Sequence, residues 1–307
     1  MSVSTKLNVR SFYKNGTSVV TVEGLQNFNV SKIFDCGQCF RFDEVTSSVH
    51  QTEFSGVAYG RFVSFAQDEN TLYIYGSTQE EYEALWKRFL AIDQDYKEID
   101  GEILASYRSL ALERAVNYGN GIRILAQDGF EAVISFIISQ NNNIPRIKKI
   151  IEALCARCGE PIALSEEMKN HLSGKSSLCS FPTPKAIYEL GEQGLFDLKT
   201  GFRAKYIYDA VCRIIDGRLD LSRIENEEDT DRAIEYLSTV KGIGTKVASC
   251  ALLFGFAKYD AFPVDVWMKR VGEKYFPEQK ELSGKCFGRY AGIAQQYLFY
   301  YERYNNN

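Results

Sequence analysis

The first hundred residues alternate between apolar and polar positions, a period of two that predicts β-strands. Three stretches rich in Val, Tyr, Phe and Ile carry this pattern, namely residues 18–23, 51–65 and 71–76. Asp68-Glu69-Asn70 has the chemistry of a turn, so residues 61–76 are expected to form a β-hairpin. The pattern therefore predicts an antiparallel sheet at the N-terminal end of the chain.

A helical period replaces the alternation after about residue 100, and residues 80–93 begin the transition. The later segments with helical spacing are 129–140, 144–158, the stretch after Phe202, 229–240 and 245–256. Strands followed by helices predict an α+β fold. We expect an N-terminal antiparallel β-sheet domain over residues 1–110. A mostly α-helical region with two subdomains and a cleft between them is expected over residues 111–307.

Composition favours a globular protein without a membrane segment. Hydrophobic residues make up 45% and charged residues 25% of the 307 residues, which is ordinary for such a protein. No apolar run approaches the ~20 residues that span a bilayer. The N-terminal segment lacks the apolar core of a signal peptide, so we expect a cytoplasmic protein, associated with the nucleoid in a bacterium. The eight cysteines are then expected to be reduced thiols.

The formal net charge of −4 argues against a protein that coats nucleic acid by bulk electrostatics. Residues 241–270 differ from this average, since they hold five basic residues and two acidic ones. The basic residues are Lys241, Lys246, Lys258, Lys269 and Arg270, and the acidic ones are Asp260 and Asp265. This segment can therefore contain a local phosphate site.

Lys241-Gly242-Ile243-Gly244 lies between two helical patterns, and Gly-x-Gly allows a tight reversal there. Thr245 can begin the second helix. The first amides of that helix have no intrahelical partner and carry the positive end of the helix dipole, so they can bind a phosphate. Taken alone, the Gly-x-Gly pattern favours a plain corner between two helices over a phosphate site.

Lys246 and Asp265 flank the second helix of this pair. An amine beside a helix N-terminus is expected to have a pKa below its usual value of about 10.4, which suits a Schiff-base lysine. Asp265 precedes an apolar helical pattern, so it is expected to be an N-cap with an ionised carboxylate. Such a fixed anion can stabilise a positively charged sugar. Cys250 shares the helix face of Lys246. Taken singly, Lys246 also fits a solvated surface lysine and Cys250 fits a core thiol.

The segment from Val240 to Arg270, VKGIGTKVASCALLFGF followed by DAFPVDVWMKR, resembles the helix–hairpin–helix, Gly/Pro-rich, then Asp superfamily of DNA glycosylases. Within it the chain is similar to the 8-oxoguanine DNA glycosylases over nearly its whole length. The resemblance implies a base-excision-repair enzyme that flips out the damaged base of double-stranded DNA. It implies that Lys246 attacks C1′ and then nicks the strand by β-elimination, while Asp265 assists electrostatically. Lys241, Gly242 and Gly244 would bind phosphate within a motif at about 229–256.

The resemblance also implies a base pocket. FDCGQCFRF (34–42) is similar to the segment whose glycine carbonyl, here that of Gly37, accepts the N7–H of 8-oxoguanine. Normal guanine has an acceptor at N7, so a buried carbonyl discriminates against it. In YAGIAQQYLFYY (290–301), Gln295 would read the Watson–Crick edge and Phe299 would stack on the base. Cys250 would lie on the other face.

The resemblance also implies which residues contact the DNA strand opposite the lesion. Asn141 would fill the vacated stack and Arg146 would meet the unpaired cytosine. Phe202 would act as a wedge, and Arg203 would be a second arginine for that cytosine. Two such arginines imply a preference for 8-oxoguanine opposite cytosine. The resemblance requires no cofactor, although the hairpin carbonyls can hold a monovalent cation, and we expect a monomer.

The chain departs from the family pattern at two positions. Trp267 stands where some members have a His, which puts a phosphate contact by that side chain in doubt, and Cys39 stands where a Ser is frequent. Single residues also have plainer interpretations. The Asn141–Asn143 run fits a helix stop, Gly37 fits a strand bulge, and Gln295 and Phe299 fit rim and core positions of an amphipathic helix.

The cysteine spacing also bears on a metal site. Cys36-x-x-Cys39 and Cys155-x-x-Cys158 invite a zinc site, but the first pair is predicted in a strand and the second on a helix, which favours buried thiols. The four-cysteine cluster of related iron–sulfur glycosylases is absent from the sequence. His50 and His171 are expected to be surface residues. Two alternatives remain, a related glycosylase for alkylated bases and a non-catalytic DNA-binding module.

Overall fold

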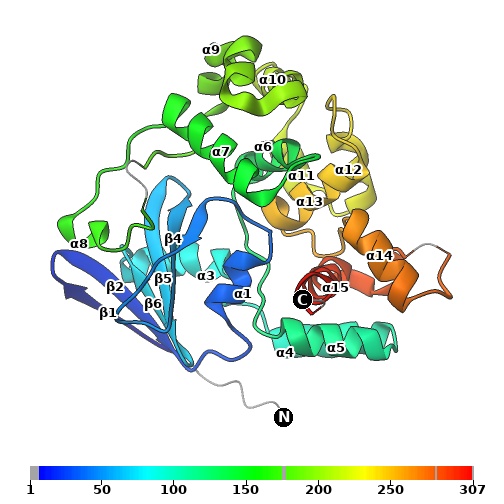
Figure 1. Ribbon diagram of the computed structural model, residues 1–307, viewed down its shortest axis with the longest axis horizontal. Coiled ribbons are helices and arrows are strands. Elements are labelled where there is room, and N and C mark those ends of the chain that lie inside the picture. The colour runs from blue at the N-terminus through cyan, green and yellow to red at the C-terminus, as the bar shows by residue number, and fades with distance from the viewer. Residues whose placement is uncertain (1–6, 175–177, 281, 306–307) are drawn as a thin grey trace.

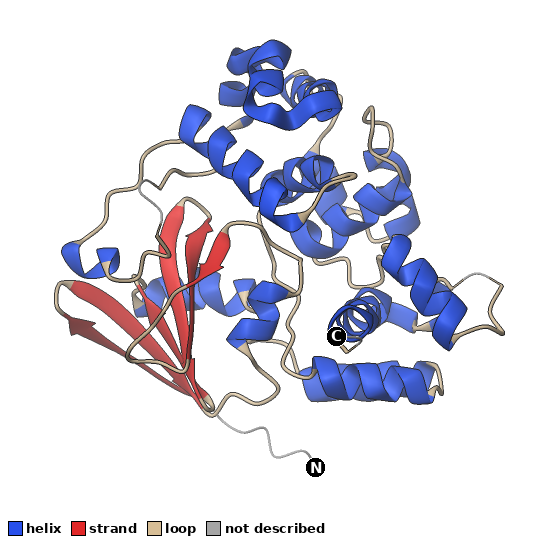
Figure 2. Cartoon of the chain, viewed as in Figure 1, coloured by secondary structure: helices blue, strands red, loops and turns tan. Residues whose placement is uncertain are grey.

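The computed structural model describes residues 7–174, 178–280 and 282–305. One antiparallel sheet lies at one side of the molecule and helices fill the rest (Figures 1 and 2). The sheet lies within residues 8–75 and the helical region follows it in the chain, so the predicted α+β fold is confirmed. No helix within these ranges is long and apolar enough to cross a membrane.

The sheet has the strand order β1-β2-β6-β5-β4-β3, with antiparallel pairing throughout. Its strands are β1 (Asn8–Lys14), β2 (Thr17–Glu23), β3 (Phe42–Glu44), β4 (Thr52–Ala58), β5 (Arg61–Asp68) and β6 (Thr71–Tyr75). The predicted hairpin at 61–76 is confirmed as β5 and β6. The predicted stretch 51–65 is divided by a turn at Tyr59-Gly60, where both residues have positive φ. No strand was predicted at β1, because this edge strand has no buried residue and therefore no alternation to detect.

Helix α1 (Val30–Asp35) leads into the Gly37 segment, so the strand predicted around Cys36–Cys39 was wrong. Asn29 caps this helix by accepting a hydrogen bond of 2.8 Å from the backbone N–H of Lys32. The helix buries Val30, Ile33 and Phe34 on one face. Its six residues are too few for the helical period to stand out from the alternation around it.

The helical region is built mainly from α4 to α15. A first helical run, formed by α2 (Gln79–Glu81), η1 (Tyr82–Trp86) and α3 (Lys87–Phe89), corresponds to the helix predicted at 80–93. The others are α4 (Tyr96–Ser106), α5 (Leu110–Gly119), α6 (Gly129–Ser139), α7 (Ile144–Cys158), α8 (Glu166–Lys169), α9 (Pro184–Leu195), η2 (Phe196–Thr200), η3 (Gly201–Arg203), α10 (Ala204–Ile215), α11 (Leu221–Asn226), α12 (Thr230–Leu237), α13 (Thr245–Phe256), α14 (Val266–Tyr275), η4 (Gly284–Cys286), η5 (Gly288–Tyr290) and α15 (Ala291–Tyr304). Helices α6, α7, α10, α12 and α13 confirm the predicted segments.

Two central helices, α6 and α13, hold the middle of the large apolar core. Both are buried on nearly every face, and Phe136 of α6 stacks on Phe254 of α13 with ring centroids 5.4 Å apart. Because α13 is fixed at its apolar end by this packing, its N-terminus is held in a constant position. That N-terminus carries the candidate nucleophile.

Helices α4 and α5 lie beside the C-terminal helix α15, as Figure 1 shows. Tyr297 of α15 donates a hydrogen bond of 2.8 Å to the Asp100 carboxylate of α4, and its ring lies against Gly119 of α5. The domain boundary near residue 110 stays a prediction, because α4 and α5 lie on either side of it and pack together.

Both histidines contact the sheet and have partners there, so the expectation that they are surface residues was wrong. His50 is hydrogen bonded to Asp68 and Tyr75, at 2.7 Å each. His171 is buried and its Nδ1 lies 2.5 Å from the Glu53 carboxylate. Each histidine is separated from its own partner by 18 or more positions, so no local sequence pattern predicts these contacts.

Candidate active site

The hairpin between α12 and α13 closes tightly at Gly242. This residue has φ +83°, and a Cβ atom there would clash with the ring of Tyr206 on α10, so both conformation and space require glycine. Gly244 is the N-cap of α13 and provides no side-chain cap. The first amides of α13 are therefore left for an external acceptor, as the sequence predicted.

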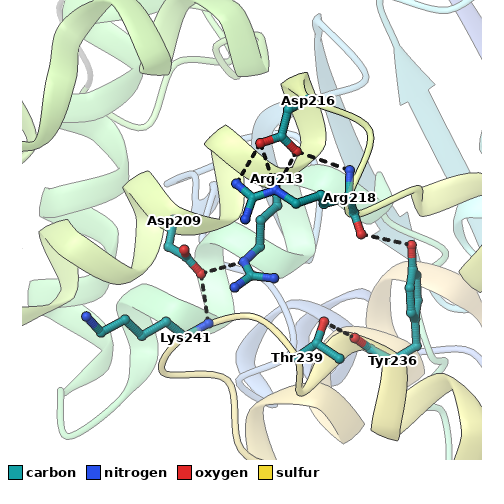
Figure 3. A network of polar contacts seen from close by, with 7 residues as sticks. All are labelled: Asp209, Arg213, Asp216, Arg218, Tyr236, Thr239 and Lys241. Carbon is teal, nitrogen blue, oxygen red and sulfur yellow. Dashed lines mark hydrogen bonds and ion pairs between the residues drawn. The ribbon is translucent and has the colours of Figure 1, made fainter.

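A polar network from α10 supports the hairpin from one side (Figure 3). The Asp209 carboxylate accepts hydrogen bonds from the backbone N–H of Lys241, at 2.9 Å, and from Arg213, at 2.8 Å. Figure 3 shows the Lys241 side chain extending away from Asp209. Its backbone is therefore fixed while its side chain is left exposed.

Lys246 and Asp265 line one cleft of about 580 Å³, which also contains Trp267 and Asn141. The chain therefore brings the candidate nucleophile and the candidate carboxylate together, although 19 positions separate them (265 − 246). A volume of this size is within the usual range for small-molecule sites. It is large enough for a purine base.

Asp265 is the N-cap of α14, as the sequence predicted. One of its carboxylate oxygens accepts hydrogen bonds of 2.9 Å from the backbone N–H groups of Trp267 and Met268. The other oxygen accepts no hydrogen bond from the described residues and remains available to the cleft. One side chain therefore holds its helix and presents a charge to the site.

Cys250 lies one turn along α13 from Lys246 and is buried. Burial raises the pKa of its thiol, and the nearby Lys246 ammonium lowers that pKa in part while the Asp265 carboxylate raises it. The three side chains thus interact electrostatically. The direction of the shift indicates a neutral thiol at neutral pH, which suits an apolar surface against a base.

The Gly37 loop lies against α15. Gly37 has φ +79°, and the position of a Cβ atom there would be 3.9 Å from the Phe299 ring. The carbonyls on either side of it are occupied: that of Cys36 accepts from Gln296 at 2.7 Å, and that of Gln38 accepts from Gln127 at 2.8 Å. In the described chain the Gly37 carbonyl itself accepts no hydrogen bond.

Gln295 is buried beside this loop, and its side-chain oxygen has no hydrogen-bond partner within the described residues. A buried acceptor without a donor costs free energy unless a ligand supplies one. The Gly37 loop and helix α15 thus carry two free acceptors, and Phe299, four residues after Gln295, adds an aromatic face beside Gly37. None of these three residues lines the Lys246 cleft itself. Trp267 meets Phe299 edge to face, with ring centroids 6.4 Å apart, and connects this ring to the Lys246 cleft.

Three glutamines that support the loop were not singled out from the sequence. Gln38 is fully buried; it donates to the carbonyls of Ile33 and Arg123 and accepts from the N–H of Leu125, at 2.8 Å each. Gln296 and Gln127 hold the flanking carbonyls. The available signal was their position, since Gln38 follows Gly37 directly and Gln296 is a second polar residue in an otherwise apolar helical stretch.

The predicted opposite-strand residues separate into exposed and buried ones. Asn141 has φ +46°, and both it and Arg146 are exposed near the cleft, while Phe202 keeps 46% of its surface accessible. Arg203 is buried instead. Its guanidinium donates to the carbonyls of Gln140, Asn141 and Thr200, so in this structure it holds the Asn141 loop in place.

The helix-stop interpretation of the asparagine run also holds. Helix α6 ends at Ser139, and Asn143 is the N-cap of α7, accepting a hydrogen bond of 3.0 Å from the N–H of Arg146. The two Cys-x-x-Cys pairs are free thiols, and across the residues placed by the structure no group of three or more His, Cys, Asp or Glu side chains could hold a metal.

The hairpin, the lysine and the capping aspartate define a helix–hairpin–helix base-excision repair protein. Residues 134–284 match the HhH-GPD superfamily of base excision DNA repair proteins, and residues 21–133 match the N-terminal domain of 8-oxoguanine DNA glycosylase. The chain belongs to the 8-oxoguanine DNA glycosylase family.

Named relatives agree with this assignment. A probable N-glycosylase/DNA lyase of Methanothermobacter thermautotrophicus is 32% identical over 219 residues, which are 62% of this chain and 67% of the relative. The 8-oxoguanine glycosylase/lyase of Clostridium acetobutylicum, solved with double-stranded DNA containing cytosine opposite 8-oxoG, is 35% identical. It superposes with a TM-score of 0.86 over 98% of this chain and 99% of its own. MBOgg1, solved with a low-affinity DNA ligand, is 34% identical, with a TM-score of 0.86 over 98% of this chain and all of its own.

Proposed function

We propose that this protein excises 8-oxoguanine from duplex DNA through a Schiff base at Lys246 and then nicks the strand by β-elimination. The observation that carries this proposal is the cleft shared by Lys246 and Asp265 at the N-terminus of α13. A passive DNA clamp needs the hairpin alone, and a glycosylase that uses water has no need of an amine in this position. Family membership and both DNA-bound relatives support the same substrate class.

The chemistry follows from these two side chains. The Lys246 ammonium gives up a proton and its amine attacks C1′; the C1′–N9 bond breaks, its electron pair leaves with the base, and the base takes up that proton. The sugar ring opens to a Schiff base between Nζ and C1′. Loss of a proton from C2′ then breaks the bond from C3′ to the 3′ phosphate oxygen, and water releases Lys246. The ionised Asp265 stabilises the positive charge that develops on the sugar in the first step.

Base recognition in this proposal uses the two free acceptors. The Gly37 carbonyl accepts the N7–H that 8-oxoguanine has and guanine lacks. The Gln295 oxygen accepts a donor of the Watson–Crick edge, where the purine has N1–H and N2–H. Phe299 stacks on one face of the ring and the neutral Cys250 thiol lies on the other. Guanine would leave the Gly37 carbonyl facing a lone pair, a mismatch that buried sites reject strongly.

The complementary strand and the backbone are held by the exposed groups. Arg146 donates to the acceptors of the unpaired cytosine, Asn141 fills the vacated stack and Phe202 acts as the wedge. Arg203, in this proposal, also faces that cytosine once its carbonyl partners move with the DNA. Lys241, Gly242 and Gly244 bind the phosphate, with a monovalent cation held by the hairpin carbonyls and no other cofactor. The protein works as a monomer in the cytoplasm, on chromosomal DNA.

Product analysis on three duplexes tests the proposal. One duplex contains 8-oxoguanine opposite cytosine, one contains an alkylated adenine, and one is undamaged. We expect free 8-oxoguanine and a nicked strand from the first duplex only. Release of the alkylated base without a nick would favour the related glycosylase instead, and binding without release of any base would favour a passive clamp.

A further inference from the structure

A third residue continues the line of Gln295 and Phe299 along α15. Gln295, Phe299 and Arg303 follow at intervals of four, so they lie on one face of the helix. The Arg303 guanidinium carbon lies 5.9 Å from the centre of the Phe299 ring and 5.0 Å from that of Tyr304. Its Nη1 lies 3.7 Å from the position of a Cβ atom at Gly37. Arg303 therefore borders the base pocket.

The charge of Arg303 has no anionic partner within residues 7–174, 178–280 and 282–305. Two neighbouring cations are paired instead: Lys274 lies 3.0 Å from Glu302, and Arg289 is paired with Glu102. Arg303 rests on two aromatic rings, and its N–H groups donate to no other group in the described part of the chain. A half-buried guanidinium that has no acceptor among the described residues and lies beside the Gly37 loop is suited to a ligand oxygen.

Gln295, Phe299 and Arg303 follow one another along α15 in the same order as the Watson–Crick edge, the ring and the C8 end of 8-oxoguanine. In the orientation given under the proposed function, on which this inference rests, the Watson–Crick edge lies at Gln295 and the ring lies on Phe299. The N7–H end of the purine then lies at Gly37, next to Arg303. In 8-oxoguanine the group that adjoins N7 on the five-membered ring is the C8 carbonyl. We propose that Arg303 donates a hydrogen bond to O8 and is a specificity-determining residue of this site.

This contact complements the one at Gly37. The Gly37 carbonyl reads a donor at N7, and Arg303 reads the acceptor at position 8. Guanine has a hydrogen at C8, so it offers no acceptor and leaves the desolvated guanidinium without a partner. The two contacts thus read both halves of the same chemical change, the oxidation of guanine at C8.

An acceptor swap in the substrate tests this role. Arg303→Met keeps the apolar stem of the side chain and removes its hydrogen-bond donors. Single-turnover excision is measured for 8-oxoguanine and for 8-thioguanine, each opposite cytosine. 8-Thioguanine keeps N7–H but has only a weak acceptor at position 8. We expect Arg303→Met to slow excision of 8-oxoguanine roughly tenfold or more, as befits a charged hydrogen bond. Excision of 8-thioguanine should change far less, and Arg303→Lys should recover part of the loss.

Cleavage of abasic-site DNA, which has no base to read, is the internal control. In Arg303→Met this rate should stay within about twofold of the wild-type rate. Arg289→Met is the matched control variant, because Arg289 also lies over a tyrosine ring, 4.8 Å from the centre of Tyr290. All its activities should stay within about twofold of wild type. Equal losses on both bases, or a parallel loss on abasic DNA, would overturn the proposal and indicate a phosphate contact or a folding defect. If the wild-type protein releases no 8-oxoguanine, the proposed function fails; if it does and Arg303→Met has no effect, only this inference fails.

Discussion

Gln296 donates a hydrogen bond of 2.7 Å from its side-chain amide to the backbone carbonyl of Cys36, 260 positions earlier in the chain. This contact joins the C-terminal helix to the residue before Gly37. Gln296 is buried, so the bond is protected from water. It fixes the peptide group between Cys36 and Gly37, and the next peptide group carries the free Gly37 carbonyl. We infer that Gln296 is a positioning residue for base recognition.

Gln296→Met is expected to slow excision of 8-oxoguanine on the order of tenfold, because a buried carbonyl loses its donor and the loop loses its orientation. Strand cleavage at a preformed abasic site should be unchanged, since no base has to be read. Gln67→Met is the matched control: Gln67 donates 2.9 Å to the carbonyl of Phe28 within the sheet domain. A parallel loss of both activities in Gln296→Met, measured under single-turnover conditions, would contradict the positioning role.

The role of the Asp265 charge in catalysis can be tested separately from its role as the N-cap of α14. Asn is as good an N-cap as Asp, so Asp265→Asn should change the free energy of unfolding by less than about 1 kcal/mol. Loss of the carboxylate charge should lower the rate of base excision on the order of 10²-fold. Urea unfolding and single-turnover excision measure the two effects. Excision at the wild-type rate in Asp265→Asn would show that the residue serves only as a cap.

Glu131 on α6 gives a pH dependence of stability. Burial raises the pKa of its carboxyl group to about 7, and the Arg41 guanidinium, 3.6 Å away, offsets part of that shift. Since the folded pKa lies above the unfolded value of 4.5, its contribution to stability is complete below pH 4.5 and is lost as the pH rises through 7.

Glu131→Gln removes this titration while keeping a polar group of the same size. It should raise the free energy of unfolding at pH 8 by up to about 3 kcal/mol relative to wild type, with little difference at pH 4. Denaturant titrations of both proteins across this range provide the measurement. Stability curves that run parallel from pH 4 to pH 8 would refute the raised pKa.

Periodic patterns along the chain predicted the helices that hold the catalytic groups. Helices α6, α7, α12 and α13 each contain two or more turns, enough for the helical period to be visible, and Asp265 was recognisable as a cap because it directly precedes one such pattern. The hairpin was recognisable because two glycines, Gly242 and Gly244, stand between two helical patterns, where they allow a tight reversal of the chain.

Long-range polar contacts could not be predicted in this way. Arg203 lies next to the exposed Phe202, yet its guanidinium is directed inward by the carbonyls of the Asn141 loop, 62 positions away. The free oxygen of Gln295 and the bond from Gln296 to Cys36 likewise depend on how α15 packs against α1 and the Gly37 loop. A sequence shows which residues are polar, but the partners of a buried polar group follow only from the packed fold.

Reductive trapping with borohydride, on a duplex with one 8-oxoguanine opposite cytosine, decides whether Lys246 is the nucleophile. The wild-type protein should form a covalent protein–DNA adduct, and Lys246→Gln should form none while still binding the duplex. Lys269→Gln, which changes another lysine lining the same cleft, should still be trapped. An adduct that persists in Lys246→Gln would contradict the assignment.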